Sequence, residues 1–186
     1  MNEYWISTVS GKKFDYVDLK PEQFDINDIA TALSHIPRWC GQIDKNFSVA
    51  EHCVNVASLL AGDDKFWGLM HDAAEAYISD IPKPFKWLIP QIEEVEFTLQ
   101  DAIVDKWDIP ISPEIVKRVK KVDRIMLVTE DEQLRSRRVD WGYYEDIEPA
   151  DITLQFWNPL RAKNEFLAVF KKAYERNKER LATAEK

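Results

Sequence analysis

Glycine is scarce in this chain, with five residues among 186 and no tract rich in glycine and serine. Runs of Ala, Leu, Lys and Glu fill much of the sequence instead, and these residues favour helices over sheets. Hydrophobic residues make up 45% of the chain, and the aromatic residues supply much of the area available for a core. We therefore expect an all-α fold, a single-domain helical bundle that spans residues 1–186.

Capping signals divide the chain into helices. Ser48 to Glu51 has the S-x-x-E pattern of a capping box, and Ser112 precedes a proline at the first position of another helix. The stretch 79–84 is expected to be non-helical, because Pro82 and Pro84 restrict the residues before them. The helices are expected at residues 28–33, after a cap at Asn27, and at 48–60, 65–77, 90–107, 112–138 and 159–181.

The predicted bundle has three parts in the order of the chain. An N-terminal arm of residues 1–26 precedes a core of residues 27–130 that carries the candidate site, and a loop and a last helix occupy residues 131–186. The arm alternates apolar and polar residues around a turn at Ser10 and Gly11, which is typical of a short hairpin. An extended arm lying on the helical body fits the same pattern, so both structures stay open.

The chain is acidic, with a formal net charge of −8 and a pI near 5.0. This charge argues against a nucleic-acid polymer as a partner, because phosphate backbones attract basic surfaces. It still allows a small anionic substrate, since a metal ion and a few local cations can hold one phosphate group. The expected partner is therefore a small molecule.

Other features favour a cytoplasmic protein. The two cysteines, Cys40 and Cys53, lie in no CxxC or zinc-ribbon spacing and are expected to be free thiols in a reducing compartment. The N-terminus lacks the basic and apolar regions of a signal peptide, and no apolar run approaches a membrane span. We therefore expect a cytoplasmic location and no membrane partner.

Two of the three histidines and two aspartates form the candidate chemical site. His52 is expected in the first turn of one helix, and His71, followed at once by Asp72, in the next. Asp123 lies on a later helix among apolar residues, where a bare carboxylate is costly to bury. A divalent metal ion would satisfy all four groups, and two imidazoles with two carboxylates suit Mn, Fe, Co, Ni or Zn.

Each of these residues has a plainer explanation when it is taken alone. A single helical histidine is more often a surface residue or a hydrogen-bonded core residue than a metal ligand. A His-Asp pair arises often by chance, and Asp123 could pair with Lys120 or Arg124. The combination of the four residues favours a metal site over these separate explanations.

Three segments that contain these residues resemble the HD-domain metal-dependent phosphohydrolases. They are SVAEH (48–52), HDAAEAYISDIPKPFK (71–86) and KKVDRIM (120–126), in the family's order H…HD…D. They are especially similar to the branch of bacterial 5′-deoxynucleotidases and phage HD phosphohydrolases, which includes phage dATP triphosphohydrolases. The resemblance covers roughly residues 1–130, and the motif around His71 is far more specific than a bare HD pair.

The resemblance implies roles for the residues of these motifs. It implies that a divalent ion (Co, Mn, Zn, Fe, Ni or Mg) is bound by His52, His71, Asp72 and Asp123. It also implies two catalytic acids, Glu75 and Asp80. Either of these would orient a water molecule or move its proton.

Three further residues are implied as substrate contacts: Arg38, Trp39 and Lys86. Arg38 and Lys86 would offset phosphate charge, and Trp39 would stack on a base, a contact worth about 1–3 kcal/mol in proteins that bind single strands. Phenylalanine is commoner beside this arginine in related sequences, so Trp39 favours the dATPase type. The simpler alternatives are a salt bridge for Arg38, a core aromatic for Trp39 and a solvated position for Lys86.

The resemblance thus implies an enzyme that removes phosphate from deoxynucleotides, first of all from dATP, dADP or dAMP, and that yields deoxyadenosine. A broad 5′-deoxynucleoside monophosphatase and a diesterase for cyclic or oligomeric nucleotides stay open as alternatives. An alternative of another class is a module that keeps the helices and binds metal or nucleotide without catalysis.

Two expectations concern the state of the protein in the cell. The loop 141–157 is rich in Trp and Tyr, and the last helix carries apolar residues, so we expect a homo-oligomer, although core packing explains these residues equally well. The expected location is the cytoplasm, which is that of the host if a phage encodes the chain.

Overall fold

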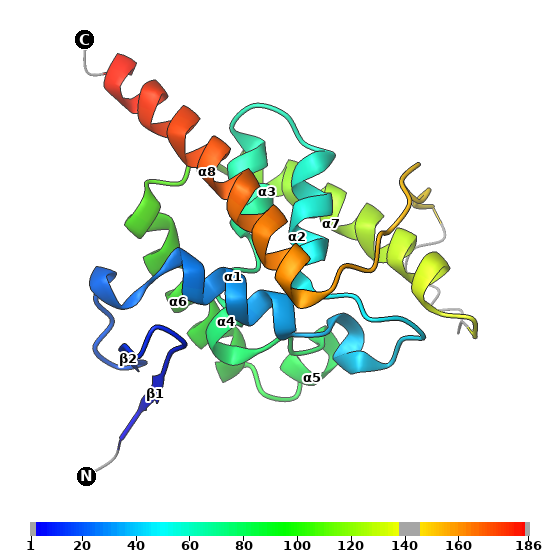
Figure 1. Ribbon diagram of the computed structural model, residues 1–186, viewed down its shortest axis with the longest axis horizontal. Helices are drawn as coiled ribbons and strands as arrows, with labels where there is room; N and C mark the ends of the chain where they lie inside the picture. Colours follow the sequence, from blue (N-terminus) through cyan, green and yellow to red (C-terminus); the bar gives the residue numbers. More distant parts are fainter. Residues whose placement is uncertain (1–2, 138–145, 185–186) are drawn as a thin grey trace.

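The computed structural model describes residues 3–137 and 146–184, and helices dominate it (Figure 1). The helices are α1 (Ile26–His35), α2 (Val49–Ser58), α3 (Asp64–Met70), α4 (Glu75–Ile78), α5 (Lys83–Lys86), α6 (Gln91–Trp107), α7 (Pro113–Leu134) and α8 (Pro159–Ala184). Of two short 3₁₀ segments, η1 (Pro21–Gln23) precedes α1 and η2 (Arg38–Gly41) lies between α1 and α2. The prediction of a mainly helical fold is confirmed, with one small two-stranded sheet added among the described residues.

The N-terminal arm forms a hairpin rather than a simple extended segment. β1 (Trp5–Ser7) pairs antiparallel with β2 (Lys13–Asp15), and Gly11 supplies the left-handed backbone conformation, φ 80°, that the turn requires. Ser10 ties the hairpin to α1, since its backbone N–H and its hydroxyl both donate to the Asp28 carboxylate, at 2.9 and 2.7 Å. The turn predicted at Ser10 and Gly11 is therefore confirmed.

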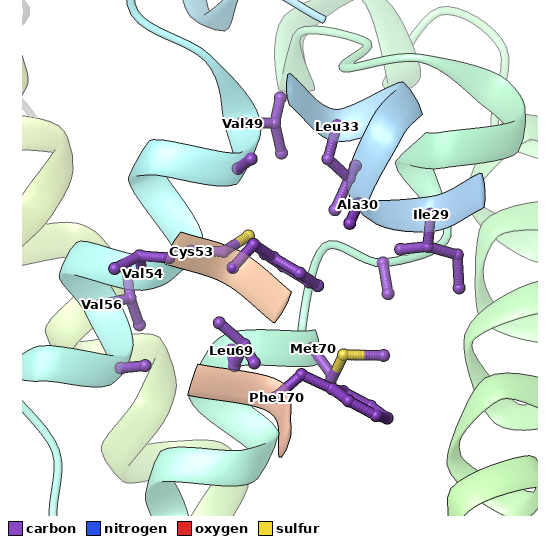
Figure 2. Close-up of a cluster of buried hydrophobic side chains, with 14 of the residues drawn as sticks. Ile29, Ala30, Leu33, Val49, Cys53, Val54, Val56, Leu69, Met70 and Phe170 are labelled. Atoms are coloured by element: carbon purple, nitrogen blue, oxygen red, sulfur yellow. The ribbon is translucent and has the colours of Figure 1, made fainter. Parts of the chain in front are cut away.

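The last helix closes the bundle. α8 crosses α1, α2 and α3 and packs against all three (Figure 1). The apolar core between these helices is shown in Figure 2, and it includes Ile29, Leu33, Leu69, Met70 and Phe170. Each such side chain contributes roughly 1.5–3 kcal/mol when it leaves water, so the contact with α8 stabilises the bundle.

Helix α2 is buried around most of its circumference, because α1, α3, α7 and α8 all pack against it. Its buried residues include two that are polar, Glu51 and His52, and both are 0% exposed. Burying a polar or charged group is costly unless the group finds partners. These two residues therefore need specific contacts. Those of Glu51 are structural, and those of His52 belong to the candidate site.

The carboxylate of Glu51 holds the segment that precedes α8. Its Oε1 atom accepts hydrogen bonds from the backbone N–H groups of Gln155 and Phe156, both at 2.9 Å, and its Oε2 atom accepts one from Trp157 at 2.7 Å. The capping box predicted at Ser48 is thus only half formed. Ser48 Oγ accepts from the Glu51 N–H at 3.2 Å, but the Glu51 side chain is directed to a segment more distant in the sequence.

Several predicted helix boundaries are wrong. The helix expected over 65–77 breaks after Met70 and resumes as α4. Residues 83–86 are helical despite Pro84, because a proline in the first turn of a helix gives up no hydrogen bond. α7 ends at Leu134 rather than near residue 138, which itself lies outside the described residues.

The first and last helices are longer than predicted. α1 begins at Ile26, and its cap is Asp25, whose carboxylate accepts a hydrogen bond from the Asn27 N–H. α8 extends to Ala184. The Trp/Tyr-rich loop expected over 141–157 lies partly outside the described residues, which resume at Asp146. No described helix combines the length and the apolar character needed to cross a membrane.

Candidate metal centre

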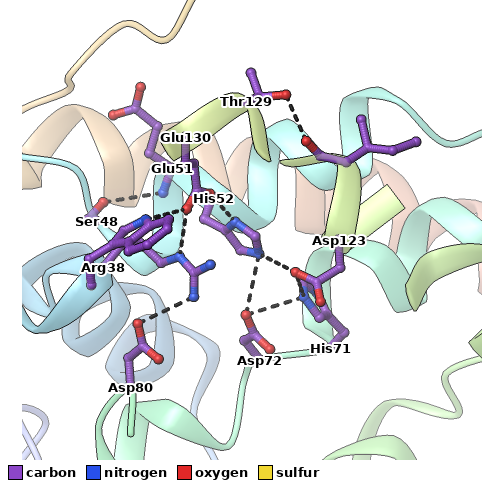
Figure 3. A network of polar contacts seen from close by, with 12 residues as sticks. Arg38, Ser48, Glu51, His52, His71, Asp72, Asp80, Asp123, Thr129 and Glu130 are labelled. Carbon is purple, nitrogen blue, oxygen red and sulfur yellow. Dashed lines mark hydrogen bonds and ion pairs between the residues drawn. The ribbon is translucent and has the colours of Figure 1, made fainter. Parts of the chain in front are cut away.

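The four predicted ligands meet where α2, α3 and α7 pack together (Figure 3). His52 is on α2, His71 and Asp72 follow the end of α3, and Asp123 is on α7. The Nε2 atom of His52 lies 3.5 Å from Asp72 Oδ2 and 3.3 Å from Asp123 Oδ1. The Nε2 atom of His71 lies 3.2 and 3.8 Å from the same two oxygens. The fold thus brings all four predicted ligand groups to one point.

Hydrogen bonds on the far side of each imidazole orient the two Nε2 atoms toward this point. His52 Nδ1 lies 2.5 Å from Glu130 Oε1, and His71 Nδ1 lies 2.8 Å from the carbonyl oxygen of Gly68. Since both oxygens are acceptors, each Nδ1 donates, and the Nε2 of a neutral ring keeps a lone pair. Both Nε2 atoms are buried and have no hydrogen-bond partner among the described residues. Metal-ligating histidines have this arrangement, with the other nitrogen fixed by a carboxylate or a carbonyl.

Exposure differs across the cluster and indicates its open side. The His52 side chain is fully buried, those of His71 and Asp72 are 10% and 18% exposed, and that of Asp123 is 36% exposed. An ion or a substrate would therefore approach past Asp123 rather than through α2.

The charges of the cluster favour a cation at its centre. Burial opposes protonation of His71, but the negative charges of Asp72 and Asp123 outweigh it and raise the pKa of His71 well above its usual value. Burial also disfavours the charged form of Asp72, yet His71 and His52 lower the pKa of Asp72 to about 2. Protons on the histidines supply the balancing positive charge when no metal is bound, and a divalent ion would take their place.

The donor set fits a divalent ion. Two imidazole nitrogens and two carboxylates, without thiolate, suit Mn, Fe, Co, Ni or Zn and leave positions open for water or substrate. The buried Nε2 atoms favour a ligand over a purely structural cluster, because buried polar atoms normally have a hydrogen-bond partner. The group of His52, His71 and Asp72 could hold a metal ion, and Asp123 offers a further oxygen from the solvent side.

Glu75, the first predicted catalytic acid, begins α4 directly beyond the HD pair. Its side chain is buried, and its Oε2 atom has no hydrogen-bond partner among the described residues. Burial and the negative charges of Asp72 and Asp80 raise the pKa of Glu75 well above its usual value, although Arg38 acts against them. A carboxyl group with a raised pKa, one turn from the predicted ligands, is suited to hold and release a proton.

Arg38 joins the second predicted acid to the cluster. Its Nη1 donates to Asp80 Oδ2 at 3.3 Å, and its Nε donates to Glu130 Oε2 at 3.2 Å. Burial raises the pKa of Asp80 in spite of the Arg38 charge. The simpler alternative for Arg38, a salt bridge, is therefore present. The two salt bridges lie beside the predicted ligands (Figure 3).

Glu130 is a site residue that the sequence patterns did not identify. It is fully buried, and besides its contacts with His52 and Arg38 it accepts a hydrogen bond from Trp39 Nε1 at 2.9 Å. It follows Asp123 by seven residues on α7, so the two carboxylates lie about two turns apart on one face of the helix. That spacing is the sequence signal by which Glu130 is recognisable.

A short antiparallel bridge holds the η2 turn against the start of α2. The Arg38 N–H donates to the Phe47 oxygen at 2.9 Å, and the Val49 N–H donates to the Ile36 oxygen at 3.0 Å. Within this turn Trp39 has a left-handed backbone, φ 59° and ψ 30°, which is uncommon for residues other than glycine. The bridge thus fixes the Arg-Trp pair beside the helix that carries His52.

Lys86 lies at the margin of the site. Its side chain is 12% exposed and forms an ion pair with Glu96 of α6. Its charge acts on Glu75, but its ammonium group is directed to Glu96. The alternative of a solvated position for Lys86 is wrong, because α5 packs against α6.

Ser79, the residue before Asp80, has a strained backbone. Its φ and ψ are 71° and 165°, a region that is essentially restricted to glycine and that carries roughly 1–3 kcal/mol of strain in other residues. We expect Ser79→Gly to raise the free energy of unfolding by about 1 kcal/mol, because relief of the strain exceeds the extra entropy of glycine in the unfolded chain. Urea denaturation measures this change.

Ser79→Ala is the matched control for this substitution. Alanine keeps the Cβ atom that causes the strain, so its free energy of unfolding should stay within about 0.5 kcal/mol of wild type. A glycine variant that is no more stable than the alanine variant would show that Ser79 is unstrained in solution.

Fold and site together define a mainly helical protein with a candidate metal centre of two histidines and two aspartates. The chain is 41% identical over 130 residues to the uncharacterized protein YfdR of Escherichia coli (strain K12), an alignment that covers 70% of this chain and 72% of YfdR. It is 33% identical over 146 residues to the uncharacterized protein RCAP_rcc00048 of Rhodobacter capsulatus, with 72% of this chain and 74% of that protein covered. The chain belongs to the family that includes YfdR. No family model matches the sequence.

Proposed function

We propose that this protein is a metal-dependent phosphohydrolase of the HD-domain type that acts on small nucleotides. The observation that supports the proposal most is the convergence of His52, His71, Asp72 and Asp123. Both Nε2 atoms are buried, face carboxylates and have no hydrogen-bond partner in the described part of the chain. The order of these residues along the chain is that of the HD-domain phosphohydrolases.

Glu75 is the residue best suited to move a proton in this site. A divalent ion at the four ligands would supply charge stabilisation to a phosphoryl oxygen and a water of lowered pKa. The raised pKa of Glu75, caused by burial and by neighbouring acids, suits it to accept a proton from water or to give one to a leaving group. Asp80 is held by Arg38 and is better suited to position a partner than to transfer a proton.

Arg38 is the proposed contact to phosphate. A guanidinium group has five N–H donors, and the bonds to Asp80 and Glu130 engage two of them. These two carboxylates fix the plane of the guanidinium group, which leaves its other donors oriented for an anion. Lys86 would add positive potential rather than a direct contact, because Glu96 binds its ammonium group.

Trp39 is the proposed contact to the base. Its indole N–H is fixed by Glu130, and the Arg135 guanidinium lies over its ring, 5.1 Å from the centroid. A base would stack on the part of the indole that is exposed, since Trp39 is only half-buried. A purine offers more stacking area than a pyrimidine, and the resemblance to dATP triphosphohydrolases narrows the proposed substrates to dATP, dADP and dAMP.

A screen of phosphate release tests this proposal. The purified protein is incubated with the mono-, di- and triphosphates of the four deoxynucleosides, with Mn²⁺, Co²⁺ and Mg²⁺ compared. We expect release of phosphate or polyphosphate from the deoxyadenosine series in preference to the others. Release from all monophosphates alike, and from no triphosphate, would support a 5′-deoxynucleoside monophosphatase instead. No release from any nucleotide with any ion would contradict the proposed activity and favour a non-catalytic binding module.

A further inference from the structure

The helix breaks at the HD pair because the side chain of Gln100 occupies the break. In a continuous α-helix the Ala74 N–H would donate to the carbonyl oxygen of Met70. Here the Ala74 N–H donates to Gln100 Oε1 at 3.1 Å, and Gln100 Nε2 donates to the Met70 oxygen at 2.8 Å. The amide of Gln100 thus replaces one backbone hydrogen bond, from a position on α6.

The segment beside Gln100 is wound more tightly than an α-helix. Hydrogen bonds from the Ala73 N–H to the Met70 oxygen and from the Glu75 N–H to the Asp72 oxygen, both at 3.0 Å, span three residues instead of four. His71 has φ −63° and ψ −28°, which are values of a 3₁₀ turn. Short 3₁₀ stretches within helices often occur at functional positions.

This winding sets the position of Glu75 relative to Asp72. Side chains three residues apart eclipse each other in a 3₁₀ helix, whereas in an α-helix they are offset by about 60° around the axis. The tight turn therefore brings the Glu75 side chain into line with Asp72. After burial, the Asp72 charge is the largest influence that raises the pKa of Glu75, which agrees with this proximity.

Packing alone does not explain an amide at this position. Gln100 is 8% exposed, and its neighbours along α6, Leu99 and Ile103, are core residues. A buried amide is costly unless its donor and acceptor are both satisfied, so an apolar residue would suit simple packing better. The two backbone groups that Gln100 binds flank His71 and Asp72.

We propose that Gln100 is a positioning residue of the metal centre, whose amide holds residues 71–74 in the tight turn that directs Asp72 and Glu75 to one point. The inference rests on the proposed metal-dependent function and extends it to a residue that contacts the backbone beside the ligands rather than the ligand side chains. Loss of the amide lets the Ala74 N–H return to the Met70 oxygen, and the segment relaxes toward an α-helix.

Gln100→Met tests the proposal, because methionine is of similar size and has no amide. The dissociation constant for Mn²⁺ is measured by competition with a chelator, together with the free energy of unfolding of the metal-free protein. We expect at least about tenfold weaker metal binding, the lower end of the effect of residues that orient metal ligands. Asn177→Leu is the matched control, since the buried Asn177 amide donates to the carbonyl oxygens of Trp107 and Asp108 at the C-terminal end of α6. It should lose stability without a change in metal affinity.

Gln100→Glu is the second variant. Burial favours the protonated form of this carboxyl group, which keeps an acceptor for the Ala74 N–H and a donor for the Met70 oxygen, so its Mn²⁺ affinity should be close to that of wild type. Three results would each overturn the proposal. The first is a Mn²⁺ affinity of Gln100→Met within twofold of wild type. The others are a loss of Mn²⁺ affinity in Asn177→Leu equal to that in Gln100→Met, and a tenfold loss in Gln100→Glu. Wild-type protein that binds Mn²⁺ but hydrolyses no nucleotide would contradict the proposed activity and leave the role of Gln100 in metal binding standing. Wild-type protein that binds no metal would overturn both.

Discussion

Asp123→Ala should remove the bound metal ion and the phosphohydrolase activity together, while the protein stays folded. Asp123 Oδ1 lies 3.3 Å from the Nε2 atom of His52 and 3.8 Å from that of His71, and its side chain is 36% exposed, so the substitution leaves no buried cavity. Residues that merely orient ligands are worth about 10–100-fold in metal affinity, and loss of a direct ligand should exceed this. Elemental analysis after dialysis measures the metal content, and phosphate release measures the activity.

Glu114→Ala is the control for this variant. Glu114 is a carboxylate on the same helix, in the exposed first turn of α7 and away from the cluster. It should retain both metal and activity. Full metal content in Asp123→Ala would remove Asp123 from the ligand set.

Glu75→Gln should keep the fold and the metal but lower kcat by about 10²–10⁴-fold, the usual range for loss of a general acid or base. Glutamine keeps the size of the side chain but cannot exchange a proton. Burial and the charges of Asp72 and Asp80 already disfavour an ionised Glu75, as its raised pKa indicates, so the neutral amide should not lower the free energy of unfolding. Steady-state kinetics and metal content are measured on the same preparation.

Asp80→Asn is the comparison for Glu75→Gln. Asparagine retains an oxygen that can accept from Arg38, so we expect a smaller loss of kcat than in the Glu75 variant. Near-normal turnover by Glu75→Gln with full metal would assign proton transfer to Asp80 or to the metal alone.

Local signals in the sequence were sufficient for most of the helices and for the positions of the four candidate ligands. The caps at Ser48 and Ser112 act on backbone groups within three residues, and the structure confirms both helix starts. His71 and Asp72 are adjacent, and their motif is long enough to be recognised. The scarcity of glycine and the runs of Ala, Leu, Lys and Glu indicated a helical fold, because these residues lower the cost of forming helices.

Contacts between distant segments could not be predicted in this way. Gln100 breaks a helix from 26–30 residues away, Glu130 orients His52 across 78 residues, and Glu51 binds backbone N–H groups 104–106 residues further on. Periodicity shows that such a residue is buried but not which group it meets. The break at 71–74 and the partners of Glu51 therefore appear only in the folded chain.

The most direct test of the metal centre is a crystal structure of the protein grown with Mn²⁺ or Co²⁺, with anomalous diffraction used to locate the ion. We predict one strong anomalous peak at bonding distance, about 2.0–2.2 Å, from the Nε2 atoms of His52 and His71 and from carboxylate oxygens of Asp72 and Asp123. The proposed metal centre would be contradicted if the ion bound only elsewhere. It would also be contradicted if protein that contains metal by elemental analysis showed no ion at these four residues.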